Sequence, residues 1–279
     1  MNNQTKACFK KEMLAYFRTK KFLIISLVII GLAMLSPLFI AGMSLLMDAM
    51  SDIYDEFGMD ITTMTGTLIS SSSIGVSSSV SDITGTAIIV VLLMLNSAAG
   101  GEQKKRSIII PKSSGLKSFS YIFPKFIIYP ISTFICALIG IFVSWGISSL
   151  LFEVNDVTFA GVLTAGIITG TCLMMYVCFH LTLGTATGKA GMSAAVCISA
   201  ALILSNVFAL IDISYMFNPF ALNILAATSV HSASFTGSEI SDIVITLLFA
   251  FALMIASYFI ALFAQNARKI DNTGNEIDL

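Results

Sequence analysis

The chain has 279 residues, of which 56% are hydrophobic and 11% are charged, and its formal net charge is −1. Soluble domains carry about 25% charged residues, so this composition excludes an ordinary soluble domain. We expect one all-α membrane domain over residues 1–279, because long apolar runs satisfy their backbone groups in lipid as helices. We expect no nucleic-acid partner.

Residues 1–21 form the first predicted element, a cytoplasmic amphipathic helix. Phe9, Met13, Tyr16 and Phe17 recur at helical spacing on one face. The other, polar side is predicted to hold Lys11, Glu12, Arg18 and Thr19. Such a helix would lie along the inner membrane surface and attract anionic lipid headgroups. The same charges also fit a simple basic anchor in front of the first span.

Six apolar segments between residues 22 and 264 are each close to the roughly 20 residues that cross a hydrocarbon core. The first is too long for the h-region of a signal peptide, which has about 7–15 residues, so we expect it to be retained. A cytoplasmic tail, 265–279, follows the last span. The six predicted spans are Phe22–Met47, Asp82–Ala99, Ile127–Leu151, Phe159–Leu183, Ala190–Ile211 and Ile243–Ala264.

The charges divide between the two sides of these spans. All 15 Lys and Arg residues fall before the first span, between the second and third, between the fourth and fifth, or after the sixth. The segments on the other side hold 11 of the 16 acidic residues and no Lys or Arg. Because cytoplasmic loops are enriched in Lys and Arg, both termini are predicted to be cytoplasmic.

The cytoplasmic segment between the second and third spans is more elaborate than a connection needs to be. It begins with Glu102 and the basic triplet Lys104, Lys105 and Arg106. A second amphipathic helix is predicted to follow, with Leu116, Phe119, Ser120 and Phe123 on one face and Pro124 as its end. We expect this helix to dock a protein partner, with lipid headgroups as the alternative.

Two outside segments are long enough to carry structure. Residues 48–81 are acidic and then Ser-rich, and fit either a flexible cap or a short helix with a solvated acidic rim. Ser214–Ala227 is apolar but too short to cross a bilayer, and Asn218 and Pro219 mark a turn within it. It is predicted to re-enter the membrane before span six; a loop lying on the surface is the alternative.

The predicted spans carry no charged residue at mid-depth, because Asp82, Asp212 and Asp242 fall at their outer ends. Buried ionisable residues mark ion pathways, so this pattern argues against an ion-coupled carrier. His180 is predicted to be a packing or hydrogen-bonding residue. Gly166 with Gly170, and an alanine stripe on span five, favour close helix contacts.

No enzyme motif is complete. Gly184–Gly191 (GTATGKAG) resembles a phosphate loop, but only three residues separate its first two glycines and Ala190 replaces the Ser or Thr. Ser193 and His180 would make a hydrolase only with a nucleophile elbow, which is missing. The five cysteines form no CxxC pair. We therefore expect no catalytic residue, no metal site and no bound cofactor.

In its order of elements the chain resembles the permease subunit of an ABC-2 type ABC transporter. The resemblance covers nearly the whole chain and rests on the helix Thr5–Lys20, the Glu102–Lys104–Lys105–Arg106 … Pro111 … Lys125 pattern, the turn Gly184–Gly191 and the segment before span six. The family has a Gly-Thr pair after the charges, where this chain has Lys105–Arg106–Ser107.

The resemblance implies a bacterial plasma-membrane protein that exports a hydrophobic or amphipathic cargo. Leu116–Phe123 would be the coupling helix that docks on separate cytoplasmic ATPase subunits, which would bind ATP and magnesium. A second permease copy or a related chain would complete the transporter. The alternatives are a sensor or immunity protein that binds a peptide without transport, and an uncoupled or ion-coupled facilitator.

Overall fold

The computed structural model describes residues 3–56, 71–102, 115–210, 218–231, 237–267, 269–270 and 276–277. Almost all of this is helix. The helices are α1 (Asn3–Arg18), α2 (Lys21–Glu56), α4 (Ser72–Asp82), α5 (Ile88–Met94), α8 (Ser118–Leu151), α9 (Phe159–Thr187), α10 (Ala190–Leu210), α11 (Leu222–Val230) and α12 (Gly237–Ala267). Two short strands, β1 (Lys269–Ile270) and β2 (Glu276–Ile277), pair antiparallel.

Five helical segments are long and apolar enough to cross a membrane by length and composition. They are Lys21–Leu46, Ser72–Gly101, Ser118–Leu151, Phe159–Thr187 and Glu239–Ala267. α10 occupies the predicted fifth span, and its Ala190–Leu204 part is a shorter apolar helix. The fold is therefore that of an all-α, multi-pass membrane protein.

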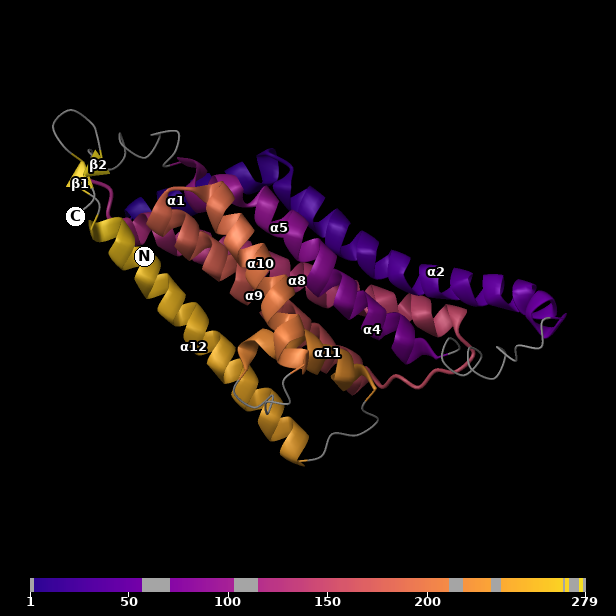
Figure 1. Cartoon of the computed structure of the whole chain (residues 1–279). Coiled ribbons are helices and arrows are strands. Elements are labelled where there is room, and N and C mark those ends of the chain that lie inside the picture. The colour runs from indigo at the N-terminus through magenta and orange to yellow at the C-terminus, as the bar shows by residue number, and fades with distance from the viewer. Residues whose placement is uncertain are drawn as a thin grey trace.

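The helices are arranged with two distinct ends (Figure 1). α1, the start of α2 and the end of α12 lie together at one end, which we call the basic end because the sequence concentrates Lys and Arg there. The end of α2, the start of α4 and the end of α8 lie at the opposite, acidic end. The first and last helices thus bring both ends of the described chain to one side of the bundle.

α9 is the central helix of the bundle. It contacts α8, α10, α11 and α12, and most of its side chains are buried. Gly166 and Gly170 let α8 approach closely, since a Cβ atom at Gly170 would lie 2.6 Å from the Phe134 ring and one at Gly166 would lie 3.1 Å from Leu138. The predicted role of these glycines in helix contact is confirmed. Small residues at helix contacts are the usual means of packing in lipid, where apolar burial gives little driving force.

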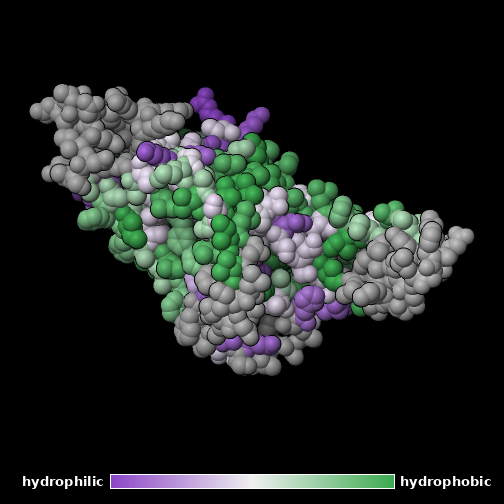
Figure 2. Space-filling model, viewed as in Figure 1, coloured by the Kyte–Doolittle hydropathy of each residue, from purple (hydrophilic) through white to green (hydrophobic). Residues whose placement is uncertain are grey.

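The alanine stripe of α10 also packs inward. Ala194 is 1% exposed and Ala201 is 5% exposed, whereas the neighbouring Met192 and Val196 face outward. α12 and α2 carry large apolar side chains on their outer faces, including Phe39 and Phe263. Figure 2 shows this apolar surface in green. An apolar exterior of this kind suits contact with lipid or with another membrane helix.

The second span differs from its prediction. It begins at Ser72 instead of Asp82 and runs to Gly101 through the π-helical segments Ile83–Ala87 and Ser97–Gly101. The last ten residues assigned to the Ser-rich outside segment are therefore helical, which fits the short-helix alternative for that segment. As a consequence Asp82, which we predicted at the end of a span, lies inside a continuous helix.

Candidate functional site

The first helix is fixed to the start of α8 by three side-chain contacts. Thr5 Oγ1 lies 3.0 Å from Ser120 Oγ, the Tyr129 hydroxyl donates to Glu12 Oε2 at 2.7 Å, and Tyr16 Oη lies 2.8 Å from Ser132 Oγ. Thr5, Glu12 and Tyr16 are separated by seven and four residues, which places them on one helical face. α1 is thus a packed part of the bundle at its basic end.

The buried face of α1 is not the one predicted. Glu12, which we placed among the outward polar residues, is 5% exposed, and Tyr16 is 1% exposed. Met13 and Phe17 are 43% and 51% exposed, and Phe9 is half-buried. The predicted membrane-facing set is therefore split: Tyr16 packs inward, and Met13 and Phe17 remain available to lipid. Burial raises the pKa of Tyr16 to about 12, so this hydroxyl stays neutral.

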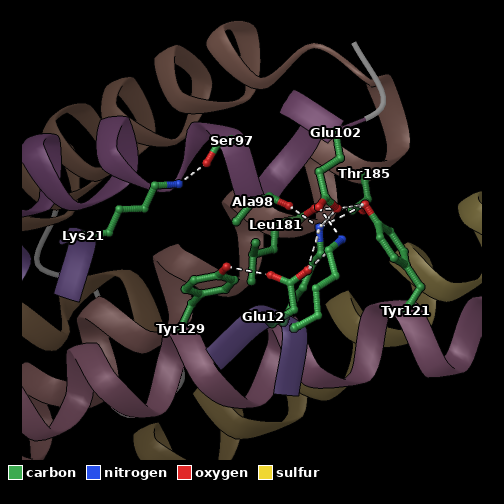
Figure 3. Close-up of polar contacts among 11 residues, drawn as sticks. Glu12, Lys21, Ser97, Ala98, Glu102, Tyr121, Tyr129, Leu181 and Thr185 are labelled. Atoms are coloured by element: carbon green, nitrogen blue, oxygen red, sulfur yellow. Dashed lines mark hydrogen bonds and ion pairs between the residues drawn. The ribbon is translucent and has the colours of Figure 1, made fainter. Parts of the chain in front are cut away.

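Lys125 is the centre of a polar cluster, which we define as Lys11, Glu12, Glu102, Tyr121, Lys125 and Tyr129. Figure 3 shows how Glu12, Glu102, Tyr121 and Tyr129 of this cluster lie. The Lys125 side chain is 1% exposed. The ammonium donates to Glu102 Oε2 at 2.7 Å, to the Tyr121 hydroxyl at 2.9 Å and to the Ala98 carbonyl at 3.0 Å. A lysine has three N–H donors, and here all three have acceptors.

Glu102 receives hydrogen bonds from three sides. Lys125 and the Tyr121 hydroxyl donate to Oε2, and Lys11 Nζ donates to Oε1, each at 2.7 Å. Burial alone would raise the pKa of Glu102, but the charge of Lys125 and these hydrogen bonds outweigh it and hold the pKa at about 2. Glu102 is therefore ionised at neutral pH.

The cluster is electrically balanced. Lys11 and Lys125 carry two positive charges, and Glu12 and Glu102 carry two negative charges. A buried charge without a partner is strongly unfavourable, whereas a balanced and fully hydrogen-bonded group is tolerated. Because Glu12 belongs to α1, Glu102 follows the second span and Lys125 belongs to α8, the cluster ties three separate parts of the chain together.

The backbone beside this cluster packs unusually closely. A Cβ atom at Gly100 would lie 2.7 Å from the Gly184 carbonyl, and one at Gly184 would lie 2.5 Å from Ala99 Cβ. Lys21 of α2 also donates to Ser97, as Figure 3 shows. The small residues Ser97–Gly101 thus bring the end of the second span against the end of α9.

The segment Gly184–Gly191, which resembles a phosphate loop in sequence, contains the end of α9. Gly188 ends this helix with φ +67°, a left-handed conformation that glycine adopts readily. The supposed phosphate loop is the turn between α9 and α10.

The predicted docking residues are only partly brought together. Lys104, Lys105 and Arg106 lie outside the described residues, and Glu102 belongs to the polar cluster. Phe119 and Phe123 stack with ring centroids 5.1 Å apart, and Phe119 is 47% exposed. They present an aromatic surface at the basic end.

The predicted boundaries of the docking helix are wrong. α8 starts at Ser118 and continues through Pro124 and Pro130 to Leu151, so Pro124 does not end a separate helix. Leu116 precedes the helix, and Ser120 faces inward to Thr5. A proline within a membrane helix is tolerated where neighbouring groups compensate for the missing N–H bond. Here the first two turns of α8 are held by α1 and Glu102, which stabilise the helix on the near side of Pro124.

Ser193 and His180, which we considered as a hydrolase pair, do lie together. Ser193 Oγ is 2.7 Å from His180 Nδ1 and also donates to the His180 carbonyl at 2.7 Å. Both side chains are fully buried. A serine whose proton goes to a carbonyl and which no substrate can reach is a helix-packing residue. The geometry therefore fits the predicted structural role of His180 as a hydrogen-bonding residue between helices.

At the acidic end, Asp156 caps the start of α4. Its carboxylate accepts from the hydroxyls of Ser71, Ser72 and Ser73 and from the Ser73 amide, at 2.5–3.1 Å. Burial would raise the pKa of Asp156, but these hydrogen bonds lower it to about 2.

The predicted turn before span six is present as a short helical segment. Asn218 begins the turn Pro219–Ala221 by accepting from the Phe220 amide at 3.1 Å, and α11 follows. The predicted turn at Asn218 and Pro219 is thus the start of a short packed helix.

The polar cluster around Lys125 could hardly be predicted from sequence patterns. Lys125 and Tyr121 stand four residues apart, and Glu12 is the lone acid in a basic helix, but nothing in their spacing links residues more than 90 positions apart. No family model, no curated protein and no solved structure matches this chain. The fold and the cluster therefore stand as the basis for a functional hypothesis.

Proposed function

We propose that this chain is the permease subunit of an ABC-2 type transporter, with six spans and both termini in the cytoplasm of a bacterium. It would pair with a second permease subunit and with separate ATPase subunits that bind ATP and magnesium. Export of a hydrophobic or amphipathic cargo is the expected activity. α10 would be the fifth span, and the segment around Asn218 and Pro219 would re-enter the outer leaflet.

The observation that carries this proposal is the anchoring of the segment between the second and third spans. The structure describes this segment up to Glu102 and again from Gly115. Both ends are bonded to α1, through Lys11 to Glu102 at 2.7 Å and through Gln4 Nε2 to the Gly115 carbonyl at 3.3 Å. A force applied to this segment would therefore reach α1, the second span and α8 together.

A subunit that is driven from the cytoplasm needs such a rigid connection. Charge-assisted hydrogen bonds are short and directional, and a buried cluster of them resists local bending. Next to this connection, the exposed Phe119 ring and its partner Phe123 offer an aromatic surface, and aromatic anchors dominate many protein interfaces. We place the ATPase contact at this surface and at the basic triplet Lys104, Lys105 and Arg106.

The test is co-purification of the chain from its native membrane in mild detergent. An ATPase subunit in stoichiometric amount is expected with the native chain, and it is expected to be lost from the double variant Phe119→Asp, Phe123→Asp. Leu14→Asp is the matched control, because Leu14 is 58% exposed on α1 at the same end but outside the docking surface. It should keep the ATPase.

The proposal fails if no ATPase co-purifies with the native chain and the double variant keeps full cellular function. One observation favours a second candidate in that case, an ion-coupled carrier. Asp82 lies inside the helix Ser72–Gly101, where its Oδ2 accepts from Ser36 Oγ at 2.5 Å. Our argument against ion coupling assumed that Asp82 ends a span. Cargo movement that follows an imposed ion gradient and stops in Asp82→Asn would support the carrier.

A further inference from the structure

Between α2, α4 and α11 lies an open hollow of about 400 Å³. Its walls are mixed: Ile40, Ile74 and Ile224 are apolar, and Ser77, Ser78 and Ser81 bring hydroxyls from one side of α4. Small-molecule sites have volumes of about 300–1,000 Å³ and combine apolar walls with a few polar groups. The hollow has the size and the lining of such a site.

Asp82 does not line the hollow itself but lies next to it, one helical turn from two of the lining residues. Ser78 and Asp82 are four residues apart on one helix, and Ile40 and Ser36 are four apart on α2, so each pair shares a helix face. Since Ser36 bonds Asp82, and Ile40 and Ser78 both line the hollow, Asp82 stands one helical turn below its wall, towards the basic end.

Asp82 forms no ion pair in the described part of the chain, although His231 is among the residues that line the hollow. The ion pairs found among the described residues involve Lys11, Lys125, Glu12 and Glu102 at the basic end, and Asp82 is in none of them. Beside it, α2 continues to expose apolar side chains at Leu38, Phe39, Met43, Leu45 and Leu46. An acidic side chain beside the apolar part of a membrane helix has an unfavourable free energy, and such residues are usually functional.

We propose that this hollow binds an amphipathic primary amine, with its ammonium group at Asp82 and the Ser78 and Ser81 hydroxyls and its apolar part against the isoleucines. A primary ammonium has three donors, which matches a carboxylate and two hydroxyls. The segments predicted on this side hold 11 acids and no Lys or Arg, a field that concentrates cations. Figure 2 shows the pale and purple surface over α4 between green apolar faces.

This inference rests on the proposed function only for what happens after binding, since it names the cargo class of the transporter. Binding itself needs neither ATP nor an ATPase. A failure of the ATPase co-purification would leave the binding result intact, and a failure of amine binding would leave the ATPase contact intact.

The experiment is calorimetric titration of octylammonium into the full chain in lipid nanodiscs, with the heat from empty nanodiscs subtracted. We expect saturable binding that weakens at least tenfold in Asp82→Asn, a variant that keeps an oxygen acceptor for Ser36. Ala227→Phe fills the hollow without touching the acid and should weaken binding by a similar factor. Neutral octanol is the matched ligand control and should not distinguish the native chain from Asp82→Asn.

Equal affinity of octylammonium for the native chain and Asp82→Asn would overturn the proposal. So would binding that is unchanged in Ala227→Phe, because the ligand would then lie elsewhere. Saturable sodium binding that is lost in Asp82→Asn, with no amine binding, would also overturn it and would make Asp82 an ion site.

Discussion

Replacing Lys125 by methionine tests whether the polar cluster holds the basic end together. Lys125→Met keeps most of the side-chain volume but removes the charge that Glu102 and Glu12 share, at 2.7 Å and 3.8 Å. It also leaves the Ala98 carbonyl and the Tyr121 hydroxyl without their donor. Removing one partner of a buried ion pair costs roughly 3–5 kcal/mol, because the remaining charge is left uncompensated.

For a chain of this size, 1 kcal/mol corresponds to a change of about 2 °C in Tm, so we expect a fall of roughly 6–10 °C. The assay is thermal unfolding followed with a thiol-reactive dye, which reports the exposure of the buried Cys172, Cys178 and Cys197. Lys117→Met is the control, since Lys117 is an exposed lysine just before the same helix. Its effect should stay within about 0.5 kcal/mol.

The pH dependence of stability is a second test of the same variant. The pKa of Glu102 is lowered from 4.5 to about 2, with Lys125 as its main stabilising charge. A lowered pKa contributes stability that is present above pH 4.5 and is lost as the pH falls towards 2. Lys125→Met lacks most of this contribution, so the stabilities of the native chain and the variant should converge over that range.

A double-mutant cycle with Glu102→Gln decides whether the two residues act as a pair. Residues in one network show coupling energies of about 0.5–3 kcal/mol, so Lys125→Met with Glu102→Gln should be more stable than the sum of the single losses predicts. Additive losses, or a Tm of Lys125→Met within a degree of the native value, would refute the reasoning that the cluster ties α1, the second span and α8 together.

Three further predictions use the same unfolding assay. Gly184→Val places a side chain where a Cβ atom would lie 2.5 Å from Ala99 Cβ, so it should destabilise by about 1–3 kcal/mol, whereas Gly191→Val, with nothing within 4 Å, should change little. Asp156→Asn should remove the stability that the native chain loses as the pH falls from 3.8 to about 2, so a variant with an unchanged pH profile would contradict the capping role. Ser193→Ala should destabilise by about 1–3 kcal/mol yet keep cellular function, and labelling of Ser193 in the native chain by a fluorophosphonate would contradict its structural role.

Apolar run length was a reliable guide to the helices, because each run must satisfy its own backbone in lipid. The first, third, fourth and sixth predicted spans all lie within helices of the structure. The start of the second span was missed because Ser72–Ser81 are polar enough to resemble a loop. In the bundle these hydroxyls are hydrogen-bonded. Ser79 donates to the Ala33 carbonyl and contacts the Ser144 hydroxyl, and Ser77 donates to the Ile74 carbonyl of its own helix.

The candidate site was harder to predict, because it depends on contacts between distant residues. Glu102 was singled out from its position before a basic triplet, but its partners Lys11 and Lys125 are 91 and 23 residues away. Glu12 looked like a solvent-facing residue by helical periodicity. It is buried because Tyr129 and Lys125 satisfy it, and periodicity cannot detect such a partner. Pro124 looked like a helix end because local rules ignore the packing that holds the preceding turns.

The polar cluster around Lys125 and the surroundings of Asp82 differ in a way that bears on the proposed function. At the basic end, two acids and two lysines neutralise one another and every donor of Lys125 is used, so this group is suited to rigidity. Asp82 has one serine partner, no ion pair within the described residues and an open hollow one turn away. A carboxylate in that state can gain interaction energy from a cation, which the neutralised cluster cannot. In the proposed transporter, the basic end would therefore transmit the movement of the ATPase, and the region around Asp82 would receive the cargo.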